Sequence, residues 1–341
     1  MIDCIFTIDY EIYGNGEGSL NELVFEPTRR LMDLFQERNA TFVAFAEAIE
    51  FRKIEEFGTD EGIGNVKNQL RDLFDRGFEI GLHLHPWWSN ARHENDGWHL
   101  DWTARNLCTL SAERIDEVVG GAVEYLRRAM GVPLYAPESF RGGLWLMQPT
   151  TTMARVLAGH GIRIDSSVFK GGWIRDLGLD FRPSLKNGYH WRFGEDVNLP
   201  DPGGALLELP IYTDMVPFWK MIKGKRIGLQ RKVPSGKNGT PLTRRFADFA
   251  RFRYPRKLDF CRMDYAEMRT VMDAVIEEDQ KSPEEFKPIV AIGHSKDLVE
   301  FESIRLFLSY LDRKGIAVSS LRDVFRKLKP KGAQVATGCR A

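Results

Sequence analysis

Two histidines separated by one residue, His83 and His85, lie in the stretch EIGLHLHPWW. Alternate side chains of a β-strand share a face, so both imidazoles would point the same way, roughly 7 Å apart along the strand. Imidazole nitrogens are common ligands of zinc and related divalent metals. The pair is therefore a candidate part of a metal site, although two histidines with only a packing role would give the same pattern.

The stretch TIDYE near the amino terminus carries two carboxylates with the same alternation. Asp9 and Glu11 would share one face of a strand, while Tyr10 turns to the other face. Taken alone, such a pair also fits a turn or a helix cap. Combined with His83 and His85, it would supply one carboxylate as a metal ligand and one as a base for water.

Two further positions follow apolar strands and carry chemically capable side chains. Arg141 stands among small residues in SFRGG, and His294 follows the apolar run in AIGHS. A single strand-end arginine or histidine is often structural. Together with the carboxylates and the histidine pair, however, they complete the parts of a metal-assisted hydrolase, which needs ligands, a base, a group that orients the base, and an acid.

The elements that must position these residues alternate along the chain. Short apolar runs alternate with amphipathic helical patterns, which is typical of βα units and a mostly parallel sheet or barrel. The carboxyl ends of parallel strands meet at one end of such a fold, so the candidate residues should converge there. The predicted strands are 2–9, 40–46, 78–86, 162–168 and 287–295, and the predicted helices are 26–40, 65–77, 111–131, 150–161, 265–279 and 302–315.

The order of these motifs resembles that of the polysaccharide deacetylases, the NodB-like carbohydrate esterase family four. The matching motifs are TIDYE, GFEIGLHLHPW, FRGG, IDSS and AIGHS, and the resemblance covers roughly residues 3–327. A divergent subgroup with TIDxE and HLHP, usually called WalW-like, is the most similar. The resemblance implies an α/β fold of the distorted (β/α) barrel type in a single domain, 1–341. It also implies hydrolysis of an N-acyl group, in particular N-acetyl, on an amino sugar or glycan.

The resemblance implies roles for four residues. Asp9 would be the base, His83 a metal ligand, Arg141 the residue that orients the base, and His294 the general acid. The pattern departs where Tyr10 replaces the family's ligand aspartate and where Trp87 stands in place of its second histidine.

Glu11 and His85 are therefore predicted as ligands from strand geometry, not from the motif. With Tyr10 in the ligand position, the reverse assignment also stays open, in which Asp9 binds the metal and Glu11 is the base.

The implied cofactor is one divalent metal ion, zinc in the first place, with nickel or cobalt as alternatives. Two other functions remain open at this point. Loss of the ligand aspartate would also fit a noncatalytic protein that binds glycan or membrane on the same barrel. An amidohydrolase-type metal barrel also uses H-x-H, but on its first strand, whereas here the pair follows about two βα units.

Two segments interrupt the alternation. Residues 87–108 are rich in Trp, His, Asn and Asp and are predicted to form a long loop, in which Trp87 and Trp88 could stack on a sugar or cover the barrel mouth as core. Residues 215–257 are strongly basic and carry a single acid, Asp248. Their mixture of lysines and aromatics favours an anionic membrane surface, or the phosphate of a lipid-linked or nucleotide-linked sugar, over a solvated loop.

Composition limits the class of partner and the compartment. The 341 residues contain 48 Lys and Arg and 48 Asp and Glu, so the chain as a whole has no charge bias toward nucleic acid. The four cysteines are scattered without metal or disulfide spacing, which suits a reducing compartment. No leader pattern and no apolar run near twenty residues is visible. These features predict a cytoplasmic protein with peripheral membrane contact through residues 215–257.

Overall fold

The computed structural model describes residues 1–95, 97–217 and 253–328. Its centre is a curled sheet in which neighbouring strands are parallel except for β10 and β11. The sheet order is β10-β11-β7-β6-β3-β2-β1-β14. The short strand β15 pairs in parallel with Asp3 and Cys4, near the start of β1. The strands of this sheet are β1 Ile2–Tyr10, β2 Val43–Glu47, β3 Glu79–Leu84, β6 Ser139–Gly142, β7 Ile164–Asp165, β10 Trp191–Phe193, β11 Leu206–Glu208, β14 Lys287–His294 and β15 Ala317–Val318.

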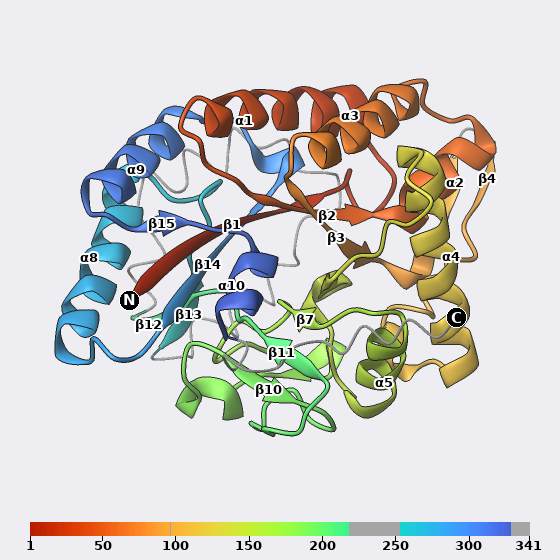
Figure 1. Cartoon of the computed structure of the whole chain (residues 1–341). Coiled ribbons are helices and arrows are strands. Elements are labelled where there is room, and N and C mark those ends of the chain that lie inside the picture. The colour runs from red at the N-terminus through yellow and green to blue at the C-terminus, as the bar shows by residue number, and fades with distance from the viewer. Residues whose placement is uncertain (96, 218–252, 329–341) are drawn as a thin grey trace, which may run out of the picture.

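Isolated bridges join the two ends of this sheet. Ile211, three residues beyond β11, pairs in parallel with Phe169 on one side and with Val290 of β14 on the other. The sheet therefore curls into a barrel, with the helices outside it (Figure 1). The (β/α) barrel expected from the sequence is confirmed.

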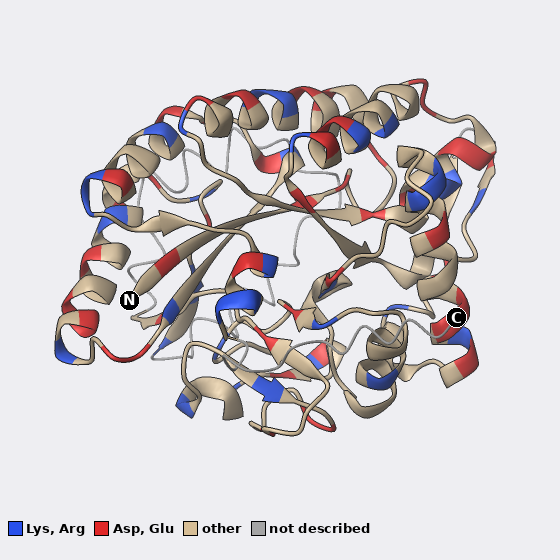
Figure 2. Ribbon diagram, in the orientation of Figure 1, with Lys and Arg blue, Asp and Glu red and all other residues tan. Residues whose placement is uncertain are grey.

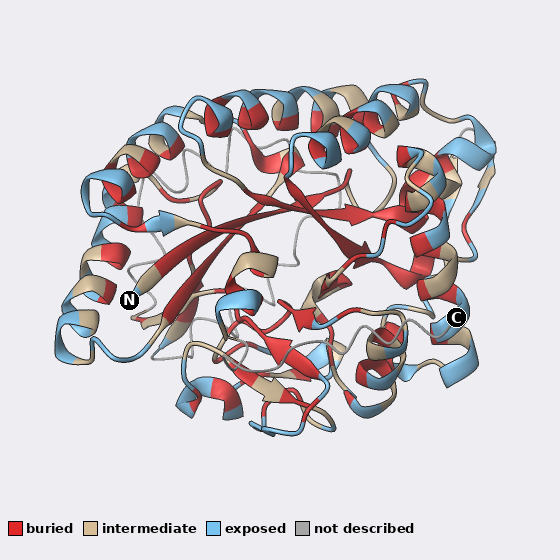
Figure 3. Ribbon diagram, in the orientation of Figure 1, coloured by how far each residue is buried: buried red, intermediate tan, exposed pale blue. Residues whose placement is uncertain are grey.

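Burial on both faces explains why the strands read as continuous apolar runs. Every residue of β1 after Ile2 is buried, and β2 and β3 are buried along their whole length. Figure 3 shows these strands buried throughout, while the outer helices are buried on one side only. The few polar side chains in β1 have partners; Thr7 Oγ1, for example, donates to the Ala291 carbonyl at 2.8 Å.

The helices form where amphipathic patterns and capping residues predict them. In α4, the Ser111 side chain accepts from the Arg114 amide, and Gly131 ends the helix with a left-handed φ of 63°. Charges of both signs mix on the outer helices (Figure 2), where i,i+3 and i,i+4 ion pairs are frequent. The helices are α1 Glu26–Gln36, α2 Ala48–Phe57, α3 Ile63–Asp75, α4 Ala112–Met130, α5 Thr151–Gly159, α8 Tyr265–Lys281, α9 Glu302–Arg313 and α10 Leu321–Leu328.

Helix α2 was not expected from the sequence, because it follows β2 without a connecting turn. The side chain of Glu47, the last residue of β2, caps the helix by accepting from the Glu50 amide at 2.5 Å. The apolar residues of strand and helix run together in VAFAEAIEF, so the change of period is hidden.

Residues 87–108 contain more structure than the long loop that was expected. A 3-10 turn at Pro86–Trp88 is followed by a short antiparallel hairpin of β4 Arg92–Glu94 and β5 Gly97–His99. The indoles of this segment pack on one another, with ring centroids 4.8 Å apart for Trp88 and Trp98 and 5.4 Å apart for Trp87 and Trp102. This aromatic packing holds the segment against the barrel.

The basic segment predicted at 215–257 falls mostly on residues 218–252, which lie outside the described part. Its two ends form an antiparallel pair, β12 Thr213–Val216 and β13 Tyr254–Lys257. Arg256 is buried in a bidentate pair with Asp214, at 2.6 and 3.0 Å. Arg256 therefore does not belong to a basic surface as expected, because the pairing of the strands turns it toward an acid. Contact of this segment with a membrane or a linked sugar stays a prediction.

Two short antiparallel strands, β8 Trp173–Ile174 and β9 Leu179–Asp180, complete the described elements. Within the ranges given above, no helix is both long enough and apolar enough to cross a bilayer.

Candidate metal and acid–base site

The six residues predicted to carry chemistry lie together at the carboxyl ends of four strands. In the pairing of β1 with β14, Asp9 is opposite His294, and in the pairing of β3 with β6, His83 is opposite Arg141. The remaining two, Glu11 and His85, directly follow β1 and β3. This is the end of a parallel barrel at which sites assemble.

Glu11, His83 and His85 form a buried three-ligand group. Glu11 Oε2 lies 3.4 Å from His83 Nε2 and 3.2 Å from His85 Nδ1. Neither Glu11 Oε2 nor His85 Nδ1 has a hydrogen-bond partner among the described residues, and both are closed off from solvent. Buried polar atoms without partners are costly, so three ligand atoms directed at one point favour a cation between them.

The donor set and its spacing fit a divalent metal. Zinc binds nitrogen and carboxylate oxygen at about 2.0–2.2 Å, which places tetrahedral ligand atoms roughly 3.3 Å from one another. The two separations involving Glu11 Oε2 agree with that edge length, and the three ligand atoms all lie within 4.8 Å of one another. Two imidazoles and one carboxylate also match the ligand number of catalytic zinc sites, which keep a fourth position open.

Surrounding groups aim these ligands. His83 Nδ1 lies 2.8 Å from the Arg141 carbonyl, which can only accept, so Nδ1 carries the proton and Nε2 faces Glu11. The His85 amide donates to the buried Glu47 carboxylate at 2.9 Å. Lys296 Nζ binds the other oxygen of Glu11 at 2.6 Å. Glu11 therefore offers a single free oxygen to the group.

The buried ionisable groups of the site shift one another's pKa values. Burial disfavours the charged form of His83, but Asp9 and Glu11 outweigh burial and raise the pKa of this imidazole to about 9. Burial lowers the pKa of His85 to about 3, so this imidazole is neutral. Burial would raise the pKa of Glu11, but Lys296 and the imidazoles hold it well below its ordinary value. The negative charges of Asp9 and Glu11 thus favour a cation at this group of side chains.

Asp9 is held by Arg141, which is completely buried. The guanidinium donates to Asp9 Oδ1 at 2.8 Å, to Thr7 Oγ1 at 2.9 Å, and to the Ser166 carbonyl and hydroxyl at 2.9 and 3.1 Å. Burial would raise the pKa of Asp9, but Arg141, His83 and His294 outweigh it and keep the pKa low. Asp9 is therefore a charged, fixed carboxylate beside the ligand group.

His294 lies between two carboxylates. Its Nε2 is 3.4 Å from Asp9 Oδ2, and its Nδ1 is 3.7 Å from Asp297 Oδ2. Arg262 holds Asp297 in place with a 2.7 Å contact. The His294 side chain is 14% exposed, against 4% for Asp9 and Glu11, so it is the group that a substrate can approach most easily.

Four functional neighbours were not identified from the sequence. Lys296 and Asp297 directly follow His294 in AIGHSKD, and this adjacency was an available signal. Glu47 and Glu50 are completely buried; Glu47 accepts from the His85 amide and Glu50 from the Ile12 amide. Their spacing of three at a strand–helix junction is typical of capping, but only the structure shows that the caps support the site.

The two tryptophans predicted to bind substrate are buried. Trp87 is 2% exposed and Trp88 is not exposed, and the Trp87 indole donates to the Gly14 carbonyl at 3.0 Å. The Trp87 ring packs on His85 with centroids 4.4 Å apart. These positions fit the alternative in which the indoles form core at the barrel mouth. Contact of either indole with a sugar stays a prediction.

Gly143 is required by the close approach of His85. An added Cβ would lie 2.4 Å from His85 Cδ2 and 2.5 Å from the Leu84 carbonyl oxygen. We expect Gly143→Ala to displace this ligand and to weaken zinc binding about tenfold or more, measured by competition with a chelator. The control is Gly159→Ala, whose Cβ would meet nothing within 4 Å and should leave the affinity unchanged. Equal zinc affinity in both variants would contradict this packing argument.

Removal of Arg141 should destabilise the fold strongly. We expect Arg141→Ala to lower the free energy of unfolding by about 3–5 kcal/mol, because the buried Asp9 carboxylate would lose the cation that donates to it. The measurement is urea unfolding at neutral pH. Arg182→Ala removes an exposed arginine paired with Asp180 and should cost less than about 1 kcal/mol. A cost for Arg141→Ala as small as that of the control would show that the pair is not buried as described.

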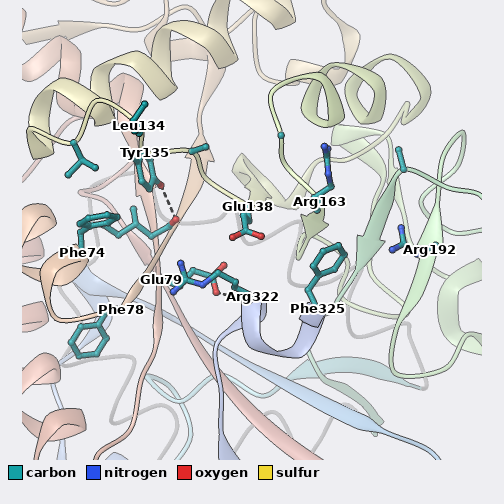
Figure 4. A pocket seen from close by; sticks show the side chains of 15 residues that line it. Phe74, Phe78, Glu79, Leu134, Tyr135, Glu138, Arg163, Arg192, Arg322 and Phe325 are labelled. Carbon is teal, nitrogen blue, oxygen red and sulfur yellow. Dashed lines mark hydrogen bonds between the residues drawn. The ribbon is translucent and has the colours of Figure 1, made fainter. Parts of the chain in front are cut away.

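A hollow of about 830 Å³ lies at the opposite end of the barrel (Figure 4). Its lining includes Glu79, the first residue of β3, and Glu138, which precedes β6, together with Arg322 and Phe325 of α10. None of the six site residues lines it. The hollow is therefore separate from the candidate site.

Comparison with known proteins gives a likeness in structure only. No family model matches the chain, and no curated protein matches it. The fold is similar to a polysaccharide deacetylase-type protein from Mycobacterium smegmatis, with a TM-score of 0.54 and 14% identity over 96% of this chain and 92% of that one. A polysaccharide deacetylase-type protein from Pseudomonas aeruginosa PAO1 gives a TM-score of 0.50 and 15% identity over 95% and 90%.

A second group of solved structures shares the fold. A GH57-type branching enzyme from Pyrococcus horikoshii gives a TM-score of 0.55 and 11% identity, over 96% of this chain and 71% of that enzyme. Deacetylase-type and glucan-branching proteins therefore both occur with this architecture. At these identities the likeness shows a shared (β/α) barrel, and the chemistry of this chain has to be derived from its own residues.

Proposed function

We propose that this protein is a metal-dependent hydrolase that removes an N-acyl group, in particular an N-acetyl group, from an amino sugar or glycan. The observation that carries the proposal is the Glu11–His83–His85 group, directly beside the Asp9–Arg141 pair and His294. Ligands, a fixed carboxylate and an accessible imidazole are the parts that amide hydrolysis needs.

Asp9 is the base in this proposal. Its Oδ1 is held by Arg141, so the carboxylate stays charged and oriented, while its Oδ2, which faces His294, takes the proton of an attacking water. Glu11 is the ligand, because its free oxygen faces both imidazoles while Lys296 holds the other. These contacts favour this assignment over the reverse one, in which Asp9 binds the metal.

His294 is the acid that protonates the departing amine. Without that proton, the amine is a poor leaving group and the acyl carbon would expel the water oxygen instead. Burial lowers the pKa of His294, and the Asp9 and Asp297 carboxylates on its two sides oppose this shift by favouring the protonated form. The 3.4 Å separation of Asp9 Oδ2 and His294 Nε2 lets the proton that Asp9 accepts pass to His294.

Glu11, His83 and His85 would hold one divalent ion, zinc in the first place, whose chemistry is to polarise a carbonyl and to acidify water. We also propose that, among the deacetylases, this protein is most similar to the WalW-like subgroup.

Acetate release tests the proposal directly. The protein is loaded with one equivalent of zinc and incubated with a panel of N-acetyl amino sugars and their oligomers. We expect acetate release that a chelator abolishes and that added zinc restores. A protein that binds zinc but releases no acetate from any member would instead favour the noncatalytic binding protein.

A further inference from the structure

Lys257, at the end of β13, lies beside the candidate site. The chain after it joins the barrel next to β14. The Leu258 amide donates to the Tyr212 carbonyl, and the Leu258 carbonyl accepts from the Ile292 amide, each at 2.9 Å. Ile292 is two residues before His294 in the same strand. Lys257 therefore lies near the carboxyl end of β14, the end that carries His294 and faces Asp9.

Two aromatic rings from other strand ends contact the Lys257 ammonium. Its Nζ lies 3.2 Å from the ring centroid of Trp145 and 4.7 Å from that of Phe169. Trp145 follows Gly143, which packs on His85, and Phe169 follows Ser167, whose hydroxyl accepts from the Gly142 amide at 2.9 Å. The two rings form an edge-to-face pair with centroids 5.4 Å apart. Lys257 thus contacts two rings near the candidate site, within electrostatic reach of Asp9 and Arg141.

The backbone that presents Trp145 is strained. Leu144 and Trp145 have φ values of 55° and 61°, in the left-handed region that bulky residues rarely adopt. Such conformations are energetically unfavourable and cluster at ligand sites. The fold keeps this unfavourable backbone conformation and thereby holds the Trp145 indole against Lys257 at the strand ends. This favours a role of the two side chains in binding a ligand over a role in packing alone.

The Lys257 ammonium is the unpaired charge in its surroundings. Among the described residues it has no hydrogen-bond acceptor and no ion-pair partner, only the two rings. The acids whose charges reach it are Asp9 and Asp259, and each already has an arginine, Arg141 at 2.8 Å and Arg262 at 3.6 Å. An ammonium can donate three hydrogen bonds, and no described residue accepts one from Lys257.

We infer that Lys257 binds an anionic group of the substrate, a carboxylate or a phosphate, so that the enzyme prefers acidic N-acyl compounds to neutral ones. This inference rests on the proposed amide hydrolysis, because the anionic group is part of the compound that the enzyme would hydrolyse. Burial lowers the pKa of Lys257 to about 7, so the ammonium is poorly solvated and an anion beside it would stabilise the charged form. A charge-assisted contact of this kind supports selectivity of about tenfold or more.

Kinetic selectivity tests the inference. The substrates are N-acetylglucosamine, its 1-phosphate and 6-phosphate, and N-acetylmuramic acid, which separate phosphate from carboxylate. We expect the wild type to favour at least one acidic member at least tenfold in kcat/KM. Lys257→Met, which keeps the contact with the Trp145 ring, should bring that ratio close to one, mainly through KM. Lys257→Arg should restore most of the preference.

Lys314→Met is the matched control, because Lys314 is an exposed lysine that caps the C-terminus of the outer helix α9, with its Nζ 5.8 Å from the Tyr310 ring centroid. It should leave the acidic-to-neutral ratio unchanged. A wild type without preference, or a Lys257→Met variant with the full preference, overturns the inference and leaves the proposed hydrolysis intact.

A binding measurement keeps the two proposals separate. Wild type and Lys257→Met are stripped of metal with a chelator, checked for equal thermal unfolding, and titrated calorimetrically with inorganic phosphate and with acetate. We expect one of the two anions to bind at least tenfold more weakly to the variant. Equal affinities, or no binding to either protein, contradict the inference. Weakened binding in a protein that hydrolyses no amide supports the anion site and counts against the proposed function alone.

Discussion

His83→Ala and His85→Ala should each abolish stoichiometric binding of divalent metal. A three-ligand site that loses one imidazole loses most of its affinity, and Glu11 alone cannot replace it because Lys296 already binds its other oxygen. The measurement is the metal content of the purified protein by mass spectrometry, followed by zinc titration of the metal-free protein. We expect about one equivalent in the wild type and a loss of at least a hundredfold in affinity in each variant.

Both variants should stay folded, because the buried Glu11 and Asp9 carboxylates keep their cationic partners Lys296 and Arg141. Thermal unfolding checks this point. The matched control is His160→Ala, because His160 is a surface histidine paired with Asp116 at 2.8 Å. It should retain a full equivalent of metal. If the double variant of His83 and His85 also retained one equivalent, the ligand assignment would be wrong.

His294→Ala should separate metal binding from chemistry. We expect this variant to bind metal as the wild type does and to lose acetate release by about 10²- to 10⁴-fold, the usual contribution of a positioned acid. The reason is that His294 touches Asp9 and Asp297 but lies outside the Glu11–His83–His85 group. Metal content and turnover of an N-acetyl substrate are measured on the same preparation.

Two outcomes would change the role of His294. Turnover at the wild-type rate would remove it from the mechanism. Loss of metal would move it into the ligand set, for which Asp9, Glu11 and His294 are close enough together. Asp297→Asn gives a graded comparison, because it keeps the shape beside His294 and removes the charge. It should bind metal normally and lose less activity than His294→Ala.

The sequence by itself was enough to predict the class of fold and to place the six candidate residues at one end of it. The alternation of Asp9 with Glu11, and of His83 with His85, is a local property of a strand, because the side-chain period of two needs no tertiary contact. The alternation of strands and helices likewise predicted the barrel, and the carboxyl ends of parallel strands had to bring the residues near one another. Cap and helix boundaries such as Ser111 and Gly131 are also local signals.

The tertiary structure alone decided which group faces which. Asp9 meets Arg141 across 132 positions of sequence, and Glu11 meets Lys296 across 285, so neither pairing follows from local spacing. Register between strands set these contacts, and it is determined by the packing of the whole core. The same long-range packing buries Trp87 and Trp88, turns Arg256 to Asp214, and leaves Lys257 with two rings and, among the described residues, no ion-pair partner. Periodicity is written into neighbouring residues, whereas burial and charge pairing arise only when distant segments meet.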